Sequence, residues 1–199
     1  LAMSSAASDV YKRQPLIENN HKVTLSEPYN LKLLKKLSLK KKFHPALKIN
    51  LPNKLVIQKF SSDILSFKWD LIVIAVSSMG IDSIGEYLKN FKKITPILVL
   101  TKGLKFDKNK IITMTEQIKK NNKRLNISAL KGPCLAKELS KKVKSYTVVA
   151  NKNIKIAKNI GSIISTNFYK TEYSTDVRGV EFSSAIKNIY SMIIGSGQG

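Results

Sequence analysis

The segment from Gly179 to Asn188 carries the side chains best suited to chemistry. Its sequence is GVEFSSAIKN, in which Lys187 and Asn188 interrupt an otherwise apolar run. At about 100° per residue, Lys187 shares a helical stripe with Ser183, Ser184 and Ser191, whose small hydroxyl side chains leave room for a ligand. The apolar flanks predict a core helix, in which a partly buried lysine can transfer a proton. The alternative is a surface lysine whose ammonium group reaches water.

Two further segments come directly after predicted strands. The first is AVSS, Ala75 to Ser78, whose small residues would let a flat ring approach the backbone. The second is TKG, which places Lys102 at the carboxyl end of a strand, where α/β sheets bind ligands. Gly103 permits the tight turn that such a loop needs. A solvated surface lysine explains Lys102 equally well from position alone.

The fourth segment is KGPCLAKE, residues 131–138. Its Gly-Pro pair predicts a sharp turn, and the residues after the turn open a helix. Such a turn exposes backbone N–H groups and a helix N-terminus to an anionic or polar ligand. Cys134 falls in the first turn of that helix, although a lone cysteine is more often an inert packing residue.

Strand-like and helical patterns alternate over more than a hundred residues, which predicts a Rossmann-like, doubly wound and mostly parallel α/β sheet. The long apolar helix from about Arg178 has no strand after it and is interpreted as the first helix of an all-α C-terminal domain. The expected strands cover residues 21–25, 70–76, 97–100, 127–130, 146–150 and 168–173, and the expected helices 31–42, 82–93, 107–121 (with Asp107 near its N-cap) and 153–165.

Three parts of the chain are expected. Residues 1–14, LAMSSAASDVYKRQ, lack the periodicity of the rest of the chain and are interpreted as a non-native leader that adds nothing to the fold. Residues 15–175 form a partial nucleotide-binding domain, and residues 176–199 begin a helical domain for substrate and catalysis. The GSGQG ending, directly after an unpaired apolar helix, suggests a chain cut at both ends.

Composition limits the classes of partner. The net charge is +22, but Arg13, Arg124 and Arg178 are the only arginines, so the excess is lysine. Nucleic-acid sites favour arginine, and no basic cluster with stacking aromatics is present, so nucleic-acid binding is not expected. The longest aliphatic run, Leu71 to Val76, is too short to insert in a membrane. A single cysteine fits a reducing cytoplasm.

Taken together, these segments resemble NAD(P)-dependent glycerol-3-phosphate dehydrogenases over residues 16–199. DLIVIAVSS is similar to the family's AD-hydrophobic-AVPS segment, and LVLTKGL to its ATKG motif. ALKGPCLAKEL is similar to SGPSFAKE, and GVEFSSAIKN to GVELGGALKN. Four motifs in the same order and at compatible spacing make the resemblance specific.

The resemblance implies reversible reduction of dihydroxyacetone phosphate to sn-glycerol 3-phosphate, a phospholipid precursor, with NADH or NADPH. It implies a small phosphorylated substrate, no metal, and a possible homodimer in the full-length protein. By the same resemblance Lys187 is the catalytic proton donor and a substrate contact, and Asn188 orients the reacting groups. Lys102 contacts both substrate and cofactor. The remaining contacts implied are Gly132 and Cys134 for substrate, and Ala136, Ser77 and Glu27 for cofactor.

Several positions depart from the family's pattern. The Gly-rich loop after the first strand is absent. Ser77 replaces proline, Cys134 replaces a serine or threonine, and Lys131 stands where serine is usual. Glu27 occupies a segment that is often basic, and an acid facing the ribose would favour NADH. The family's phosphate-binding Arg-Asn pair and its Asp fall beyond residue 199, so this chain alone is expected to bind substrate poorly and not to turn over.

Three other interpretations of the sequence remain open. A relative with the same two-domain plan could act on another hydroxy acid or sugar acid. A lysine-rich nucleic-acid-binding protein is supported by charge alone. Finally, the chain could be a folded remnant without activity.

Overall fold

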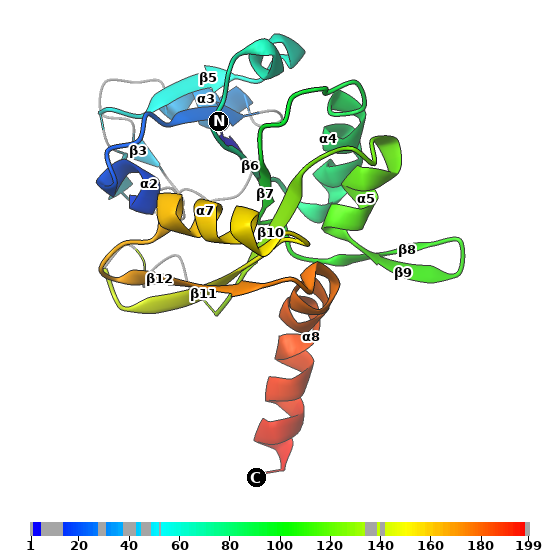
Figure 1. The fold of residues 1–199 in the computed structure, drawn as a ribbon. Coiled ribbons are helices and arrows are strands. Elements are labelled where there is room, and N and C mark those ends of the chain that lie inside the picture. Colours follow the sequence, from blue (N-terminus) through cyan, green and yellow to red (C-terminus); the bar gives the residue numbers. More distant parts are fainter. Residues whose placement is uncertain are drawn as a thin grey trace.

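The computed structural model describes residues 2–4, 14–27, 31–37, 43–44, 49–51, 53–133, 139 and 142–197. Its centre is an eight-stranded sheet with the order β12-β11-β10-β7-β6-β1-β2-β5 (Figure 1). The strands are β1 (Ala2–Ser4), β2 (Thr24–Glu27), β5 (Val56–Lys59), β6 (Ile72–Ala75), β7 (Ile97–Val99), β10 (Ile127–Lys131), β11 (Ser145–Ala150) and β12 (Tyr169–Ser174).

The six strands from β5 to β10 all run parallel. Their order along the sheet is third, second, first, fourth, fifth and sixth, which is the doubly wound order of dinucleotide-binding folds. The order reverses between β1 and β6, and ligands bind such sheets outside the carboxyl ends of the strands at this switch point. β11 then pairs antiparallel with β10, and β12 lies parallel to β11. The predicted fold class is confirmed.

The N-terminal residues belong to the centre of this sheet. β1 lies between β2 and β6, and Met3 has 0% of its surface exposed. The expectation that residues 1–14 add nothing to the fold is therefore wrong for residues 2–4, and α2 (Gln14–Glu18) already begins at Gln14. A strand of three residues is too short to show periodicity, and two paired neighbours are what stabilise it.

Helices cover both faces of the sheet, as alternation along the central strands requires. One apolar cluster holds Val73 and Ala75 of β6 and is covered by α2, α3 (Leu31–Leu37) and α7 (Ile154–Ile164). The other holds Ile72 and Ile74 and is covered by α4 (Ile81–Tyr87), α5 (Met114–Asn121) and the 3-10 turn η1 (Ser62–Ser66). Two smaller elements are the antiparallel pair of β3 (Phe43–His44) with β4 (Ile49–Asn50) and the 3-10 turn η2 (Ser78–Gly80).

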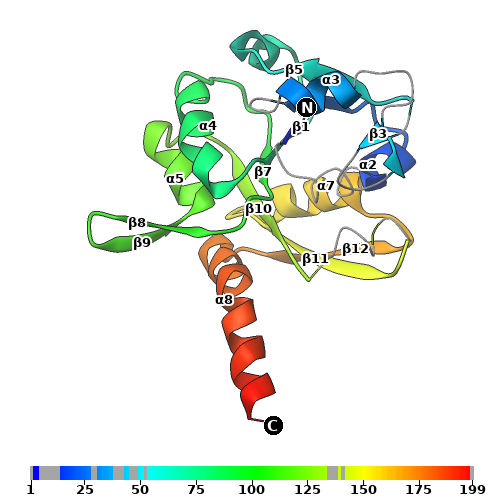
Figure 2. The same ribbon diagram turned by 180° about the vertical axis from the view of Figure 1, so that it is seen from behind.

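The predicted helix over 107–121 is wrong in its first half. Residues 104–113 form a hairpin of β8 (Leu104–Asp107) and β9 (Lys110–Thr113), which projects from the sheet near the start of α8 (Figure 2). Lys108 and Asn109 have φ values of 43° and 64°, as a two-residue hairpin turn requires. The cap is Thr113, whose side chain forms a reciprocal capping box with Glu116, and not Asp107.

The last helix, α8 (Val177–Ser196), starts against the sheet and then points away from it, with the C-terminus at its far end (Figure 1). Its second half is exposed: Ile189, Met192 and Ile193 have 57%, 75% and 61% of their surface accessible. The expectation of a core helix therefore holds only for its first turns in this chain, because nothing among the described residues covers the rest. No helix in the described part of the chain is long and apolar enough to span a membrane.

Candidate active site

The AVSS and TKG segments lie against each other at the carboxyl ends of β6 and β7. The hydroxyl of Thr101 donates a 2.7 Å hydrogen bond to the carbonyl oxygen of Val76. Gly103 has a φ of 134°, and a Cβ built there would lie 3.3 Å from the Cβ of Ser78. The turn therefore needs glycine both for its backbone conformation and for its close approach to η2, as the sequence predicts.

The segment after β10 reaches the TKG loop through Lys131. The ammonium group of Lys131 donates to the carbonyl oxygen of Thr101, and the hydroxyl of Thr147 donates a 2.8 Å hydrogen bond to the carbonyl oxygen of Lys131. A Cβ on Gly132 would lie 2.7 Å from the carbonyl oxygen of Tyr146. Gly132 is thus required by close backbone packing against β11, whatever ligand it contacts.

A cavity of about 440 Å³ lies between this segment and α8. Gly132 and Pro133 line it on one side, and one stripe of α8 lines it on the other, including Ser183, Ser184 and Lys187. The hydroxyl oxygen of Ser184 is buried and has no hydrogen-bond partner among the described residues. Lys187 is partly buried. Lys187, Ser183 and Ser184 of the predicted stripe therefore do line a cavity, beside the predicted Gly132.

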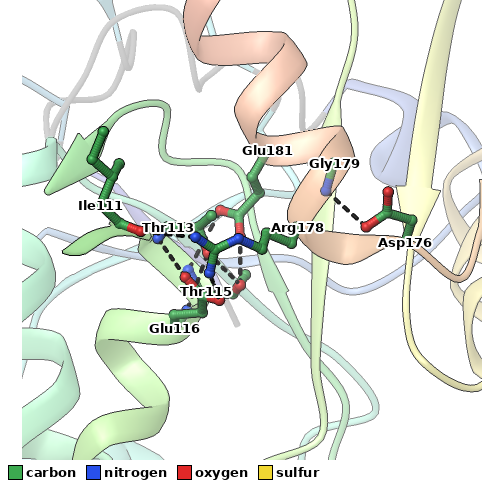
Figure 3. Close-up of polar contacts among 8 residues, drawn as sticks. All are labelled: Ile111, Thr113, Thr115, Glu116, Asp176, Arg178, Gly179 and Glu181. Carbon is green, nitrogen blue, oxygen red and sulfur yellow. Dashed lines mark hydrogen bonds and ion pairs between the residues drawn. The ribbon is translucent and has the colours of Figure 1, made fainter.

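The start of α8 is held by polar contacts that Figure 3 shows. Asp176 caps the helix by accepting a 2.8 Å hydrogen bond from the amide of Gly179. The guanidinium of Arg178 lies 2.6 Å from Glu116 Oε1 and donates at 2.9 Å to the carbonyl oxygen of Ile111. These contacts attach the first turn of α8 to β9 and to the capping box of α5.

The other predicted site residues have different surroundings. Lys102 is exposed and does not line the 440 Å³ cavity. Ser77 is exposed at the N-cap of η2. Glu27 ends β2, the strand next to β1, with 2% of its surface exposed. Cys134 and Ala136 lie outside the described residues, as do the side chains of Asn188 and Ser191.

A second cavity, of about 430 Å³, lies near the amino ends of the parallel strands. His21, Val23, Trp69 and Asp70 line it, just before or at the amino ends of β2 and β6. Doubly wound sheets bind ligands at the carboxyl ends of their strands, so the cavity beside Lys187 is the candidate active site.

Sequence reasoning missed the buried ion pair beneath this cavity. Lys131 Nζ lies 3.7 Å from Glu181 Oε1, and the two side chains are 3% and 1% exposed. A signal was available, because Glu181 is the one acidic residue in the α8 sequence VRGVEFSSAIKNIYSMIIGS. A carboxylate in an apolar helix requires a buried partner.

The strand order, the switch point and the lysine-bearing helix at the carboxyl end of β10 define a dinucleotide-binding domain of the dehydrogenase type. The family model described as the N-terminus of NAD-dependent glycerol-3-phosphate dehydrogenase matches residues 14–157. The chain therefore belongs to the NAD-dependent glycerol-3-phosphate dehydrogenase family, and the predicted resemblance is confirmed.

Individual relatives agree with this. The chain is 26% identical over 196 residues to an NADP(+)-dependent glycerol-3-phosphate dehydrogenase of Archaeoglobus fulgidus, a match covering 97% of this chain and 57% of the relative. It is 29% identical over 171 residues to a glycerol-3-phosphate dehydrogenase of the NAD(P)+ type from Psychrobacter arcticus, covering 83% and 37%. The crystal structure of the Coxiella burnetii glycerol-3-phosphate dehydrogenase has a similar fold, with a TM-score of 0.83 at 19% identity, covering 94% and 57%. The chain thus spans between about a third and three fifths of these proteins.

Proposed function

We propose that this chain supplies the dinucleotide-binding domain and the catalytic lysine of a glycerol-3-phosphate dehydrogenase. The reaction is the reversible reduction of dihydroxyacetone phosphate to sn-glycerol 3-phosphate, which feeds glycerophospholipid synthesis. The observation that carries the proposal is the position of Lys187. This lysine lines a cavity together with Gly132, and its helix is attached to the carboxyl end of β10.

The fold fits NADH or NADPH as cofactor. When bound, the dihydronicotinamide supplies a hydride to the carbonyl carbon of the substrate. Glu27 lies at the end of β2, where dinucleotide-binding folds hold the ribose, and Ser77 and Lys102 come after the next two parallel strands beyond the switch point. Residues 5–13, after β1, contain serine and alanine where the family has a Gly-rich loop, and they lie outside the described residues. An acid at residue 27 favours NADH over NADPH, because it would repel a 2′-phosphate.

Lys187 acts as the general acid. Its ammonium group donates a proton to the carbonyl oxygen as the hydride adds to the carbonyl carbon, so the ketone becomes a secondary alcohol and the lysine becomes neutral. Its positive charge also stabilises the developing alkoxide. In the oxidation direction the neutral amine takes the proton back from the alcohol.

The neighbouring residues bind and orient the substrate. Lys102 attracts the phosphorylated substrate at the TKG loop, and Asn188 orients the reacting groups. Gly132 and Cys134 contact the substrate, and Ala136 contacts the cofactor. The Ser184 hydroxyl, buried without a partner among the described residues, is available to donate to a ligand in the cavity.

The test replaces Lys187 with methionine. Because the chain spans 57% of the Archaeoglobus fulgidus relative, residues 1–197 would be fused to the remaining C-terminal part of that protein, giving what we call the extended fusion. The fusion is expected to oxidise NADH in the presence of dihydroxyacetone phosphate. Lys187→Met should lower kcat about 10²- to 10⁴-fold, the usual contribution of a general acid, with NADH affinity by fluorescence nearly unchanged.

A matched control is Lys155→Met, which removes an exposed lysine from α7. It should leave kcat unaltered. Full activity of the Lys187→Met fusion would contradict the proposed mechanism. Reduction of 2-oxo acids in preference to dihydroxyacetone phosphate would favour the related hydroxy-acid dehydrogenases.

We further propose that residues 176–199 begin a helical second domain, whose helices cover the exposed apolar side of α8. Hydrogen exchange should then be slower in the second half of α8 in the extended fusion than in the 199-residue chain. The enzyme is proposed to be a cytoplasmic homodimer without nucleic-acid affinity, which cell fractionation, sedimentation and oligonucleotide titration would test.

A further inference from the structure

The ammonium group of Lys131 lies where three of the chemistry-bearing segments meet. Lys131 is the last residue of β10, and its side chain is 3% exposed. Its ammonium group donates to the carbonyl oxygen of Thr101 in the TKG loop and pairs with Glu181 of α8 at 3.7 Å. The ammonium group of Lys131, at the end of β10 and next to Gly132, thus contacts both the loop after β7 and the helix that carries Lys187.

The carboxylate of Glu181 has further donors in α5. The hydroxyl of Thr115 donates to Oε2, and the amide of Thr115 donates to Oε1 at 3.4 Å (Figure 3). A carboxylate 1% exposed is stable only when it is paired and hydrogen-bonded in this way. The contact is therefore stable only when these atoms are correctly placed. Replacing either charged residue by a neutral one leaves the other charge buried without its partner.

The residues of this contact are close along the chain to three of the predicted functional residues, Lys102, Gly132 and Lys187. Thr101 precedes Lys102, and Lys131 precedes Gly132. Glu181 lies six residues before Lys187 on the same helix, which is less than two turns. A shift of the ammonium group would therefore move the loop lysine, the glycine and the helix lysine relative to one another.

We propose that Lys131 is a positioning residue, whose ammonium group sets the placement of the TKG loop, of the Gly132–Pro133 segment and of α8 around the cavity. The lysine is a departure from the serine that the family's motif shows at this place, and a serine is too short to contact both Thr101 and Glu181. The proposed positioning of these segments by Lys131 rests on the structure. The expected effect of Lys131 on kcat/KM rests also on the proposed function.

The placement is tested on the 199-residue chain by NMR. Lys131→Met should shift the backbone amide signals of residues 101–103, 132 and 177–187 together. The control is Lys105→Met, which breaks an ion pair with Asp82 at 2.5 Å that is half exposed, and which should shift signals only near β8 and α4. Shifts in Lys131→Met that stay within β10 and β11 would overturn the proposal.

The kinetic consequence is tested in the extended fusion with a double variant. Lys131→Met alone leaves the Glu181 carboxylate buried without its cation, so both stability and activity should fall. Lys131→Met with Glu181→Gln removes both charges and should recover stability, but methionine cannot donate to Thr101. We therefore expect kcat/KM of the double variant to stay about 10- to 100-fold below that of the unmodified fusion, the effect of small misplacements of reacting groups.

The outcomes separate the two proposals. Wild-type kcat and KM in the stable double variant would overturn the positioning role, because only stability would then depend on the pair. If the unmodified fusion is inactive while the Lys131→Met form of the 199-residue chain shows the joint NMR shifts, the proposed function is contradicted and the placement stands.

Discussion

Helices α7 and α8 have similarly apolar sequences but opposite surroundings. In α7, the side that holds Ala157, Ile160 and Ile164 is buried against the sheet. In the second half of α8, Ile189 and Ile193 are more than half exposed. The comparison shows that an apolar pattern identifies which side of a helix is suited to burial. Whether other elements of the chain pack on that side depends on the rest of the fold.

The two helices are also anchored by different forces. α7 is held by apolar burial along its length, whereas the described contacts that hold the start of α8 are largely polar: the cap by Asp176, the ion pair of Arg178 with Glu116 and the buried pair of Glu181 with Lys131. Polar contacts fix direction and register more strictly than apolar ones, because they depend on the positions of single atoms. That suits a helix on which the proposed function depends for the position of Lys187.

The largest expected difference comes from shortening one isoleucine in each helix. Ile160→Ala in α7 removes a side chain 1% exposed and should lower the free energy of unfolding by about 2–5 kcal/mol. Ile193→Ala in α8, where the side chain is 61% exposed, should change it by less than about 0.5 kcal/mol. Urea unfolding of both variants measures the contrast, and equal losses would mean that α8 is covered in solution.

A glycine in each helix should respond to alanine with opposite sign. A Cβ at Gly161 in α7 would overlap the Tyr173 ring, which would have to move and give up its 3.0 Å hydrogen bond with Thr171. Gly161→Ala should therefore cost about 1 kcal/mol. At Gly195 in α8 a Cβ meets nothing within 4 Å, so Gly195→Ala should favour the helix by at most about 1 kcal/mol. Thermal unfolding and helical circular dichroism report the two signs, and destabilisation by both would contradict the comparison.

The N-cap residues of α7 and α8 form similar hydrogen bonds, so replacing each one compares how the two helices depend on their caps. The side chain of Asn153 accepts a 3.0 Å hydrogen bond from the amide of Lys155, and Asp176 accepts one from Gly179. Each cap is worth about 0.5–2 kcal/mol. Asn153→Ala should lower global stability, whereas Asp176→Ala should mainly speed hydrogen exchange in the first turn of α8. A purely global effect of Asp176→Ala would show that α8 unfolds with the sheet.

The smallest effect concerns a lysine that lies between the starts of the two helices. Lys119 of α5 lines a cavity together with Lys152, just before α7, and with Asp176 and Arg178 at the start of α8. Burial, and then the nearby charge of Lys152, hold the pKa of Lys119 below its ordinary value of 10.5. In the folded chain this lysine therefore loses its proton at a lower pH than in the unfolded chain.

Between the pKa of Lys119 in the folded chain and 10.5, the unfolded state binds more protons than the folded state. The free energy of unfolding therefore increases as pH rises through this range. The charge of Lys119 is a penalty that is fully present below the folded pKa. Lys119→Met should therefore be slightly more stable than the parent chain at pH 7, and the difference should shrink at higher pH. Urea unfolding at a series of pH values measures it, and a difference that grows with pH would contradict the sign of the shift.

Elements with strong local signals could be predicted from the amino-acid order alone. Continuous apolar runs indicated the buried strands β6 and β7, because a strand covered on both faces favours apolar side chains along its length. The spacing of Lys187 from Ser183 and Ser184 indicated one face of a helix, and the structure shows that this face lines a cavity. Four ordered motifs indicated the family.

Features that depend on distant partners emerged only in the folded chain. Residues 2–4 form the central strand because β2 and β6 pair with them on both sides, which no local pattern announces. The β8–β9 hairpin displaced a predicted helical turn through two residues of positive φ. The contact of Lys131 with Thr101 and Glu181 joins residues 30 and 50 positions away, and a buried charge shows its role only once the groups that compensate it are in place.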